Sequence, residues 1–437
     1  MPTPLYDCLK NYAESGPARF HMPGHKGHTM PVPELAAVAP IDLTEITPTG
    51  NLFEAGEPFD SAQQLWADLM GFDCCQFLTN GSTGGIHTGL TLLAKPGDRI
   101  LCDRGCHRAV FNAMSLLDLH PVYMERPWLA EHNQTAHFTV ADIEKQLNAH
   151  PDIKTVCITS PTYSGLLSDI PGIAKVIHDR GGRLFVDGAH GAHLAFLGIR
   201  AYTGADVVVV SAHKTLPALG QTALLFVNGI DHEEVRRAAT IYNTSSPSYP
   251  MTASMDVARQ WLVDHPEEYQ RAAAQVARLR EKYPSLKGLP MDPARLTVKV
   301  KNGEDFAQKL EKMGIYPEMD DGGHVVFICT AMDTDEDFAR LEAALDSLRE
   351  EMGDCAPIPA PPMPEQVLSP REALLLREKD VLPLSECEGR VSSCQLAPYP
   401  PGVPVVAPGE RITKKELSYL KQIGYNKKDV QVVHGNP

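Results

Sequence analysis

A run of β-branched residues just before a lysine most strongly constrains the fold of this chain. Residues 205–210 read Ala-Asp-Val-Val-Val-Val, and residues 211–215 read Ser-Ala-His-Lys-Thr. An apolar run of this length predicts a strand that is covered on both faces, as in a parallel sheet. We therefore expect Lys214 just beyond a strand end, in mostly apolar surroundings. Desolvation disfavours a charged amine and favours its use as a nucleophile, although a lysine that reaches back to solvent is the alternative.

A second predicted strand, residues 183–187, ends in an acid. Its sequence is Arg-Leu-Phe-Val-Asp, and it precedes the lysine by about one strand-helix-strand repeat. Asp187 and Lys214 can then face the same crevice. Pyridoxal phosphate enzymes need such a pair, because a lysine binds the cofactor aldehyde and a carboxylate keeps the pyridine nitrogen protonated. An aspartate that only begins a turn is the alternative for Asp187.

A turn rich in glycine and hydroxyl groups follows another predicted strand end. Residues 77–85 read Phe-Leu-Thr-Asn-Gly-Ser-Thr-Gly-Gly, and a helix is expected over 86–93. Glycine lets the backbone approach an anion, and the N–H groups of a helix start, with Ser82 and Thr83, can donate to a phosphate. Ordinary N-capping of the helix is the alternative.

A fourth predicted strand leads to a histidine. Residues 99–108 predict a strand that opens into a loop, and this loop contains His107. An imidazole can lie flat against an aromatic cofactor ring, although a lone loop histidine is usually a surface group. All four features follow predicted strands, where ligands bind in open parallel sheets.

Together these stretches resemble the fold-type I pyridoxal phosphate decarboxylases of ornithine, lysine and arginine. The resemblance covers nearly the whole chain, in the order of the family. The matching stretches are residues 20–27, 80–85, 104–107, 187–190, 211–215, 244–249, 399–404 and 408–410.

The resemblance implies pyridoxal phosphate as the cofactor and gives each predicted residue a role. Lys214 would be the Schiff-base lysine, Asp187 the partner of the pyridine nitrogen, and His107 the residue stacked on the ring. The contacts to the phosphate would come from four residues: Ser82, Thr83, Ser211 and His213.

Two further roles follow from the resemblance alone. Thr244 would reach the phosphate of a neighbouring subunit, which implies a homo-oligomer, at least a dimer, with shared active sites. Its alternative is a hydroxyl that caps the following helix. Glu410 would hold the distal cationic group of the substrate, and a surface glutamate is the alternative.

The implied reaction is decarboxylation of arginine, lysine or ornithine to the amine, as in polyamine metabolism. We favour arginine, because the compact chain resembles the biosynthetic branch of the family. Another pyridoxal phosphate reaction, such as transamination or aldol cleavage, and a catalytically silent relative are the alternatives. Gly188 and Gly220 depart from the family pattern, which usually has an acid at the first position and a hydroxyl residue at the second.

Composition agrees with a globular enzyme. The chain has 437 residues, 43% of them hydrophobic and 22% charged, which is enough for two or three domains. No stretch predicts a membrane span or a signal peptide, so we expect a cytoplasmic protein. A formal charge of −15 disfavours nucleic acid as a partner.

The cysteines and histidines do not predict a metal site. Ten cysteines are scattered without a CxxC pair, which argues against disulfides and a zinc ribbon and predicts reduced thiols. Three histidines, at positions 21, 25 and 28, are close together. No cysteine or carboxylate completes that set, so we expect no metal there.

The predicted fold is α/β, of the fold-type I transferase-like class, with a mostly parallel sheet and helices on both faces. We expect an N-terminal arm (1–55), a large cofactor-binding domain (56–285), a small α/β domain (286–355) and a Pro-rich connector with a C-terminal segment (356–437). The small domain is predicted to contain strands 296–300 and 324–329 and helices 304–313 and 335–352, the last capped by Thr334.

Overall fold

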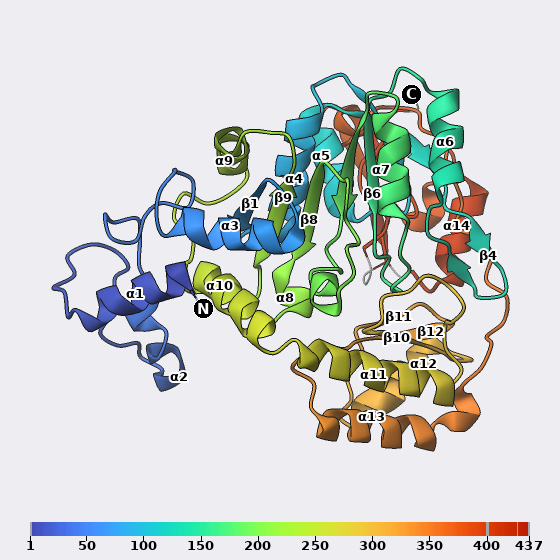
Figure 1. Cartoon of the computed structure of the whole chain (residues 1–437). Helices are drawn as coiled ribbons and strands as arrows, with labels where there is room; N and C mark the ends of the chain where they lie inside the picture. The colour runs from blue at the N-terminus through green and yellow to red at the C-terminus, as the bar shows by residue number, and fades with distance from the viewer. Residues whose placement is uncertain (1, 399–401, 426, 436–437) are drawn as a thin grey trace. The chain divides into compact units, whose positions relative to one another are not determined.

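The computed structural model describes residues 2–398, 402–425 and 427–435, and the chain divides into two compact units. The first contains residues 1–92, 188–271 and 330–332. The second contains residues 93–187, 272–329 and 333–437. Figure 1 traces the chain from its N-terminus in blue to its C-terminus in red. The predicted domain boundaries stay a prediction.

The first unit contains three strands in the order β1-β9-β8. They are β1 (Cys74–Leu78), β8 (Val207–Ser211) and β9 (Ala223–Val227), and β9 is antiparallel to both neighbours. Leu78 and Ser211 are both paired with Ala223. Because β1 and β8 run in the same direction, the residues that follow them lie at one edge of these strands. The valine run of β8 is fully buried, as the sequence predicts.

Helices α3 and α9 pack against β1 in the first unit. The helix that follows β1 begins at Gly81, five residues before the predicted start. The helical segments of this unit are α1 (Pro4–Glu14), α2 (Pro33–Ala36), η1 (Ala39–Ile41), α3 (Phe59–Met70), α4 (Gly81–Leu93), η2 (Leu194–Leu197), α8 (Ala212–Thr215), α9 (His232–Thr240), α10 (Tyr249–Asp264) and the start of α11 (Glu267–Lys282).

The second unit contains four parallel strands in the order β7-β6-β2-β3. They are β2 (Arg99–Asp103), β3 (His120–Met124), β6 (Thr155–Thr159) and β7 (Arg183–Asp187). The helices that connect them are α5 (Arg108–Leu117), α6 (Val140–Ala149) and α7 (Ile170–His178), and a short ribbon is formed by β4 (Trp128–Leu129) and β5 (Gln134–Thr135). Since the strands are parallel, the loop after β2 and the end of β7 lie at the same edge.

A smaller antiparallel sheet in the second unit packs against helices (Figure 1). Its strands are β10 (Arg295–Lys299), β11 (Met319–Asp320) and β12 (His324–Ile328), and it shares an apolar core with α11, α12 (Gly303–Lys312) and α13 (Asp335–Ser347). The predicted strands and the first helix are confirmed within one residue. Thr334 caps α13 through a capping box with Asp337, also as predicted.

The predicted length of the last of these helices is wrong. α13 ends at Ser347, and the short 3₁₀ turn η3 (Arg349–Glu351) follows. Leu348, at the C-cap, has a φ of −107°, which takes the backbone out of the helix. The apolar spacing continues past this turn because Leu348 and Met352, on either side of it, pack on the same core, so spacing alone does not mark where the helix ends.

The C-terminal part begins with the Pro-rich residues 356–364, which form neither helix nor strand, as predicted. Beyond them, β13 (Lys379–Pro383) pairs with β14 (Asp429–Val433), and α14 (Lys414–Gln422) packs on the same apolar cluster. A π-helical turn, η4 (Glu372–Leu376), and a 3₁₀ turn, η5 (Leu384–Glu386), complete this part. Tyr399, Pro400 and Pro401 of the motif over 399–404 lie outside the described residues.

All ten cysteines are free thiols. Among the described residues, helices are too short or too polar to cross a membrane.

The strands and helices form an α/β fold with a mostly parallel central sheet and a smaller C-terminal α/β part, as the sequence predicts.

Candidate active site

Lys214 lies in the single helical turn α8, directly after β8. Its side chain is half-buried, and its Nζ is 3.1 Å from Nε2 of His190. An ammonium only donates, so a neutral His190 with an unprotonated Nε2 is the acceptor when Lys214 is charged. His190 itself is 3% exposed. The structure therefore joins the predicted nucleophile to a buried base.

The sequence analysis gave His190 no role. The available signal was its position three residues after Asp187, in the short loop Asp-Gly-Ala-His that leaves β7. That spacing does not say whether the imidazole turns toward the lysine, because the loop has no periodic structure. The contact between His190 and Lys214 depends on the path of this loop.

Two of the predicted phosphate contacts flank Lys214. The Ser211 hydroxyl is fully buried and has no hydrogen-bond partner among the described residues. Nδ1 of His213 is 2.9 Å from the carbonyl oxygen of Thr222. Because a carbonyl only accepts, Nδ1 carries the proton, and Nε2 can donate to an anion only when the imidazole is charged. A buried hydroxyl without a partner is consistent with a polar ligand at this position.

Ser82 and Thr83 belong to the first turn of α4, since this helix begins at Gly81. The Gly81 N–H donates to the carbonyl of Gln221 at 2.7 Å, which joins the start of α4 to the loop between α8 and β9. β1 and β8 run in the same direction, so the first turn of α4 and residues 211–214 lie at the same edge. The structure thus brings together the four predicted phosphate contacts in the first unit.

Gly85 explains how α4 approaches β8 so closely. A Cβ at position 85 would lie 2.4 Å from Cγ2 of Val209 and 2.8 Å from Cδ1 of Leu78. Such distances are far below van der Waals contact. The glycine that looks like part of a turn in the sequence therefore lets a helix start pack directly on the strand that leads to Lys214.

Thr244 is exposed, in a loop that is tied to the start of α4. Nδ2 of Asn80 donates to the carbonyl of Tyr242 at 3.0 Å. The Thr244 hydroxyl accepts from the N–H of Ser246 at 3.2 Å, within the loop, and does not cap the following helix α10, whose N-cap is Ser248. Its role toward a neighbouring subunit stays a prediction.

In the second unit, Asp187 is the last residue of β7 and is 2% exposed. It is paired with Thr159 of β6, and its carbonyl accepts from the N–H of Ser160 at 3.0 Å. The buried position at the carboxyl end of a parallel strand is the one that the sequence predicts. Asp187 is followed directly by Gly188, with which the chain passes into the first unit.

His107 is the N-cap of α5, in the loop after β2. Its Nδ1 accepts from the N–H of Ala109 at 3.2 Å, so the proton of the neutral ring is on Nε2. Asp103 supports the same loop, because its fully buried carboxylate accepts from the N–H of Gly105 at 2.8 Å and from Nε of Arg126 at 3.0 Å. The start of α5 thus holds one nitrogen of the imidazole.

Glu410 is fully buried. Its Oε2 is 2.8 Å from Nη2 of Arg104 and accepts from the N–H of Ala407 at 2.6 Å. The alternative of a surface glutamate is therefore wrong. Substrate binding by Glu410 stays a prediction, and the geometry favours a role toward the loop that contains Arg104.

The departure at Gly188 has a steric cause. A Cβ at this position would lie 2.7 Å from the hydroxyl oxygen of Tyr202, and Tyr202 is only 3% exposed. The tyrosine occupies the space that a side chain at 188 would need. A Cβ at Gly220 would contact nothing within 4 Å, and nothing in the structure explains that departure.

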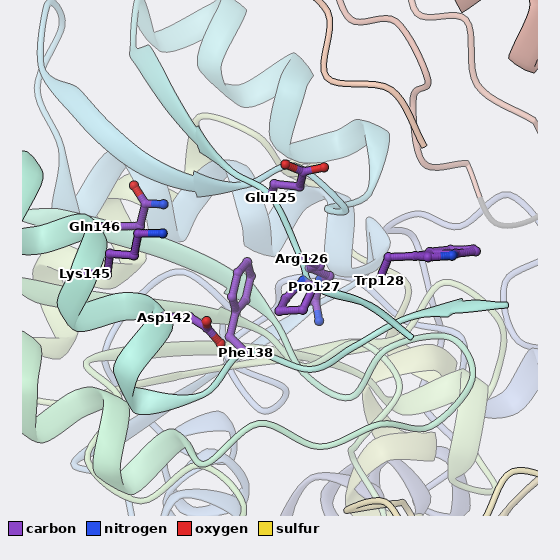
Figure 2. Close-up of a pocket in the computed structure, with 8 residues that line it drawn as sticks. All are labelled: Glu125, Arg126, Pro127, Trp128, Phe138, Asp142, Lys145 and Gln146. Carbon is purple, nitrogen blue, oxygen red and sulfur yellow. The ribbon is translucent and has the colours of Figure 1, made fainter. Parts of the chain in front are cut away.

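A pocket of about 340 Å³ in the second unit contains none of the predicted site residues (Figure 2). Its buried cation, Arg126, is paired with Asp103. The pocket is lined by Glu125, Arg126, Pro127, Trp128, Phe138, Asp142, Lys145 and Gln146. We assign it no function.

The histidines of the N-terminal arm have other partners than a metal. Nε2 of His21 is 2.9 Å from the hydroxyl of Tyr12, and Nε2 of His25 is 3.1 Å from Oδ2 of Asp42. Within the part of the chain that the structure describes, three or more His, Cys, Asp or Glu side chains are nowhere grouped to hold a metal ion.

The α/β fold, with a mostly parallel central sheet and a smaller C-terminal part, is that of the fold-type I class. Two family models cover most of the chain: "Orn/Lys/Arg decarboxylase, major domain" matches residues 3–288, and "Orn/Lys/Arg decarboxylase, C-terminal domain" matches residues 358–429. The chain belongs to the Orn/Lys/Arg decarboxylase family, and the prediction of a decarboxylase fold and family is confirmed.

Individual relatives agree with this membership. The chain is 30% identical to the uncharacterized protein YaaO of Bacillus subtilis, over 99% of this chain and 96% of that one. It is 29% identical to an arginine decarboxylase of the same organism, over 96% and 93% of the two chains. A structure of the constitutive lysine decarboxylase of Escherichia coli has a TM-score of 0.82 at 20% identity and covers 99% of this chain and 82% of that one.

Proposed function

We propose that this chain removes the α-carboxylate of a basic amino acid, with pyridoxal phosphate held by Lys214 and arginine as the preferred substrate. The observation that carries the proposal is the half-buried amine of Lys214, 3.1 Å from the imidazole of His190 and three residues after the unpartnered hydroxyl of Ser211. The similarity to a relative named arginine decarboxylase supports the choice of arginine.

His190 is proposed to exchange a proton with Lys214. Only an uncharged amine attacks an aldehyde, so Lys214 must lose a proton before it can hold the cofactor. Nε2 of His190 is close enough to accept that proton directly from Nζ. The imidazole can return the proton when the amine is released.

The phosphate group would be held by the start of α4 and by the turn around Lys214. Ser82 and Thr83 stand in the first turn of α4, where the helix dipole favours an anion. Ser211 offers its unpartnered hydroxyl, and Nε2 of His213 can donate once the ring is charged.

Asp187 and His107 would hold the ring of the cofactor. When bound, pyridoxal phosphate accepts the electron pair that remains at the α-carbon as carbon dioxide leaves. The buried carboxylate of Asp187 would keep the ring nitrogen protonated, which would make this acceptance effective. His107 would lie against the ring, with its Nδ1 held by the bond from the Ala109 N–H. We expect Asp187→Ala to retain some cofactor and to lose most turnover.

A homo-oligomer with shared active sites is part of the proposal. Thr244 is exposed, and Ile241 beside it is 66% exposed. The N-terminal arm also presents large apolar side chains to solvent, among them Phe20 at 95% and Leu35 at 54%. These groups are expected to be covered by a second copy, in which Thr244 then reaches the phosphate.

A subunit-mixing experiment tests the shared site. Lys214→Ala and Thr244→Ala are purified separately and then combined under conditions that exchange subunits. If Thr244 acts across the interface, the mixture regains activity that exceeds the sum of the two variants. A mixture that shows only the summed activity contradicts a shared site.

The reaction itself is tested with purified protein and pyridoxal phosphate against arginine, lysine and ornithine, and the products are identified by mass spectrometry. We expect the decarboxylated amine of arginine to predominate. Borohydride reduction and peptide mapping should locate a pyridoxyl group on Lys214, and Lys214→Ala should lack it. A keto acid as product would favour transamination, and labelling elsewhere than Lys214 would overturn the proposal.

A further inference from the structure

The C-terminal part of the chain forms hydrogen bonds with the loop that contains His107. Arg104 extends from this loop, and its Nη1 donates to the carbonyl of Pro404 at 2.6 Å. Its Nη2 donates to the carbonyl of Val405 at 3.0 Å and to Oε2 of Glu410 at 2.8 Å. These acceptors all lie within one stretch, residues 402–410.

The pair formed by Arg104 and Glu410 is shielded from water. The side chains are 7% and 0% exposed, and Arg104 lies over the rings of Phe111 and Tyr123 at 5.4 and 5.3 Å from their centroids. Burial alone lowers the pKa of Arg104, but the Glu410 carboxylate more than offsets this, so the pKa is raised and the guanidinium stays charged. Removing either partner would leave the other charge buried without compensation.

The C-terminal part of the chain also forms hydrogen bonds on the other side of His107. The N–H of Arg108 donates to the carbonyl of Gly402 at 3.1 Å. Nε2 of Gln395, which precedes the stretch 402–410, donates to Oδ1 of Asn112 in α5 at 2.7 Å. His107 is therefore bracketed by Arg104 and Arg108, and both are held by residues that lie about 300 positions later in the chain.

We infer that Glu410 is a positioning residue, which acts through Arg104 to hold His107 in the orientation that stacks on the cofactor ring. The inference rests on the proposed function, because it gives His107 its purpose. The contacts are of the kind that set geometry: a buried ion pair is a weak source of stability, but its directional bonds fix the position of the groups that it joins. Both donors bond Oε2 of Glu410, whereas Oε1 is buried without a hydrogen-bond partner among the described residues, so the test has to separate positioning from binding of a substrate cation.

The test is Glu410→Gln, which keeps the shape of the side chain and removes its charge. Glu365→Gln is the matched control, because Glu365 forms an exposed pair with Arg411 at 3.2 Å in the same C-terminal part. The first measurement is hydrogen exchange, by mass spectrometry, of peptides that cover residues 104–112 in the cofactor-free proteins. In Glu410→Gln we expect these amides to exchange about ten to a hundred times faster than in the wild type, while Glu365→Gln is unchanged.

The second measurement separates positioning from substrate binding. In Glu410→Gln, we expect weaker binding of pyridoxal phosphate, a changed visible circular dichroism of the bound cofactor and a lower kcat, with KM for the amino acid within about twofold of the wild-type value. A raised KM with unchanged dichroism and exchange would make Glu410 a substrate ligand and overturn the inference.

A second variant covers the case in which Glu410→Gln does not fold. Arg104→Lys keeps the charge of the pair but loses the forked geometry that reaches Val405 and Glu410 together. It should show the same exchange and dichroism changes in a milder form, and wild-type behaviour in both would contradict the inference. Failure of the proposed function would appear separately, as wild-type protein that decarboxylates none of the three amino acids while the exchange result stands.

Discussion

The buried carboxylate of Asp256 is expected to make the stability of the first unit depend on pH. Asp256 belongs to α10 and is 0% exposed. Its Oδ2 accepts from the N–H groups of Leu5 and Tyr6, at 3.0 and 3.2 Å, and so caps the first turn of α1. Burial raises the pKa of Asp256 from 3.8 to about 6, although the two backbone donors and Arg259 oppose the rise.

The sign of the effect follows from this direction. A carboxyl whose pKa is higher in the folded state binds its proton more tightly there, so its contribution is most favourable at low pH and is lost as pH rises from about 4 to about 7. The rise in pKa corresponds to roughly 2–3 kcal/mol across this interval. Ionisation of Asp256 as the pH rises therefore lowers the stability of the packing between α10 and α1.

The perturbation that removes this dependence is Asp256→Asn. The amide oxygen can still accept from the two N–H groups of α1 but does not titrate. We expect the free energy of unfolding of the wild type, relative to that of the variant, to fall by roughly 2–3 kcal/mol between pH 4 and pH 7. Urea denaturation at a series of pH values measures it, with Asp264→Asn, an exposed carboxylate on the same helix, as the control. Parallel curves for the wild type and Asp256→Asn over this range would refute the reasoning.

Three further predictions test the packing around the candidate site and in the small domain. Gly85→Ala should lower the stability by about 1–3 kcal/mol and weaken cofactor binding, and Val209→Ala should restore part of both losses, as measured by denaturation and titration. Arg126→Met should cost about 3–5 kcal/mol, because it leaves the carboxylate of Asp103 buried without its cation; a loss below 1 kcal/mol in urea would contradict this. Thr334→Ala should lower stability by about 1 kcal/mol through loss of the cap of α13, and an unchanged urea midpoint would speak against the capping box.

The strands that position the site could be predicted from the sequence because each is a short apolar run that ends in a polar residue. Residues 183–187 form a strand with the predicted bounds, a strand begins the stretch 99–108 as predicted, and Lys214 follows the predicted valine run. The start of α4 could not be predicted in this way. Glycine has a low intrinsic helix propensity, and only the contact of Gly85 with β8 makes a helix favourable there.

Contacts between distant parts of the chain were also beyond the sequence pattern. Arg104 and Glu410 are 306 positions apart, so neither the ion pair nor the burial of Glu410 can be read from local composition. The contact between His190 and Lys214 likewise depends on the path that the chain takes after β7 and after β8. Residue types and their positions at strand ends were sufficient for the chemistry, whereas partner choice required the folded backbone.

The tyrosine that stands against Gly188 restricts how this site can change over evolution. An acid at position 188 is usual in the family that the sequence resembles, yet here its first carbon would collide with the phenol of Tyr202. A lineage can therefore gain or lose that acid only if position 202 becomes smaller first, or at the same time. Engineering that places a carboxylate there must begin with Tyr202, and libraries that vary position 188 alone should recover glycine.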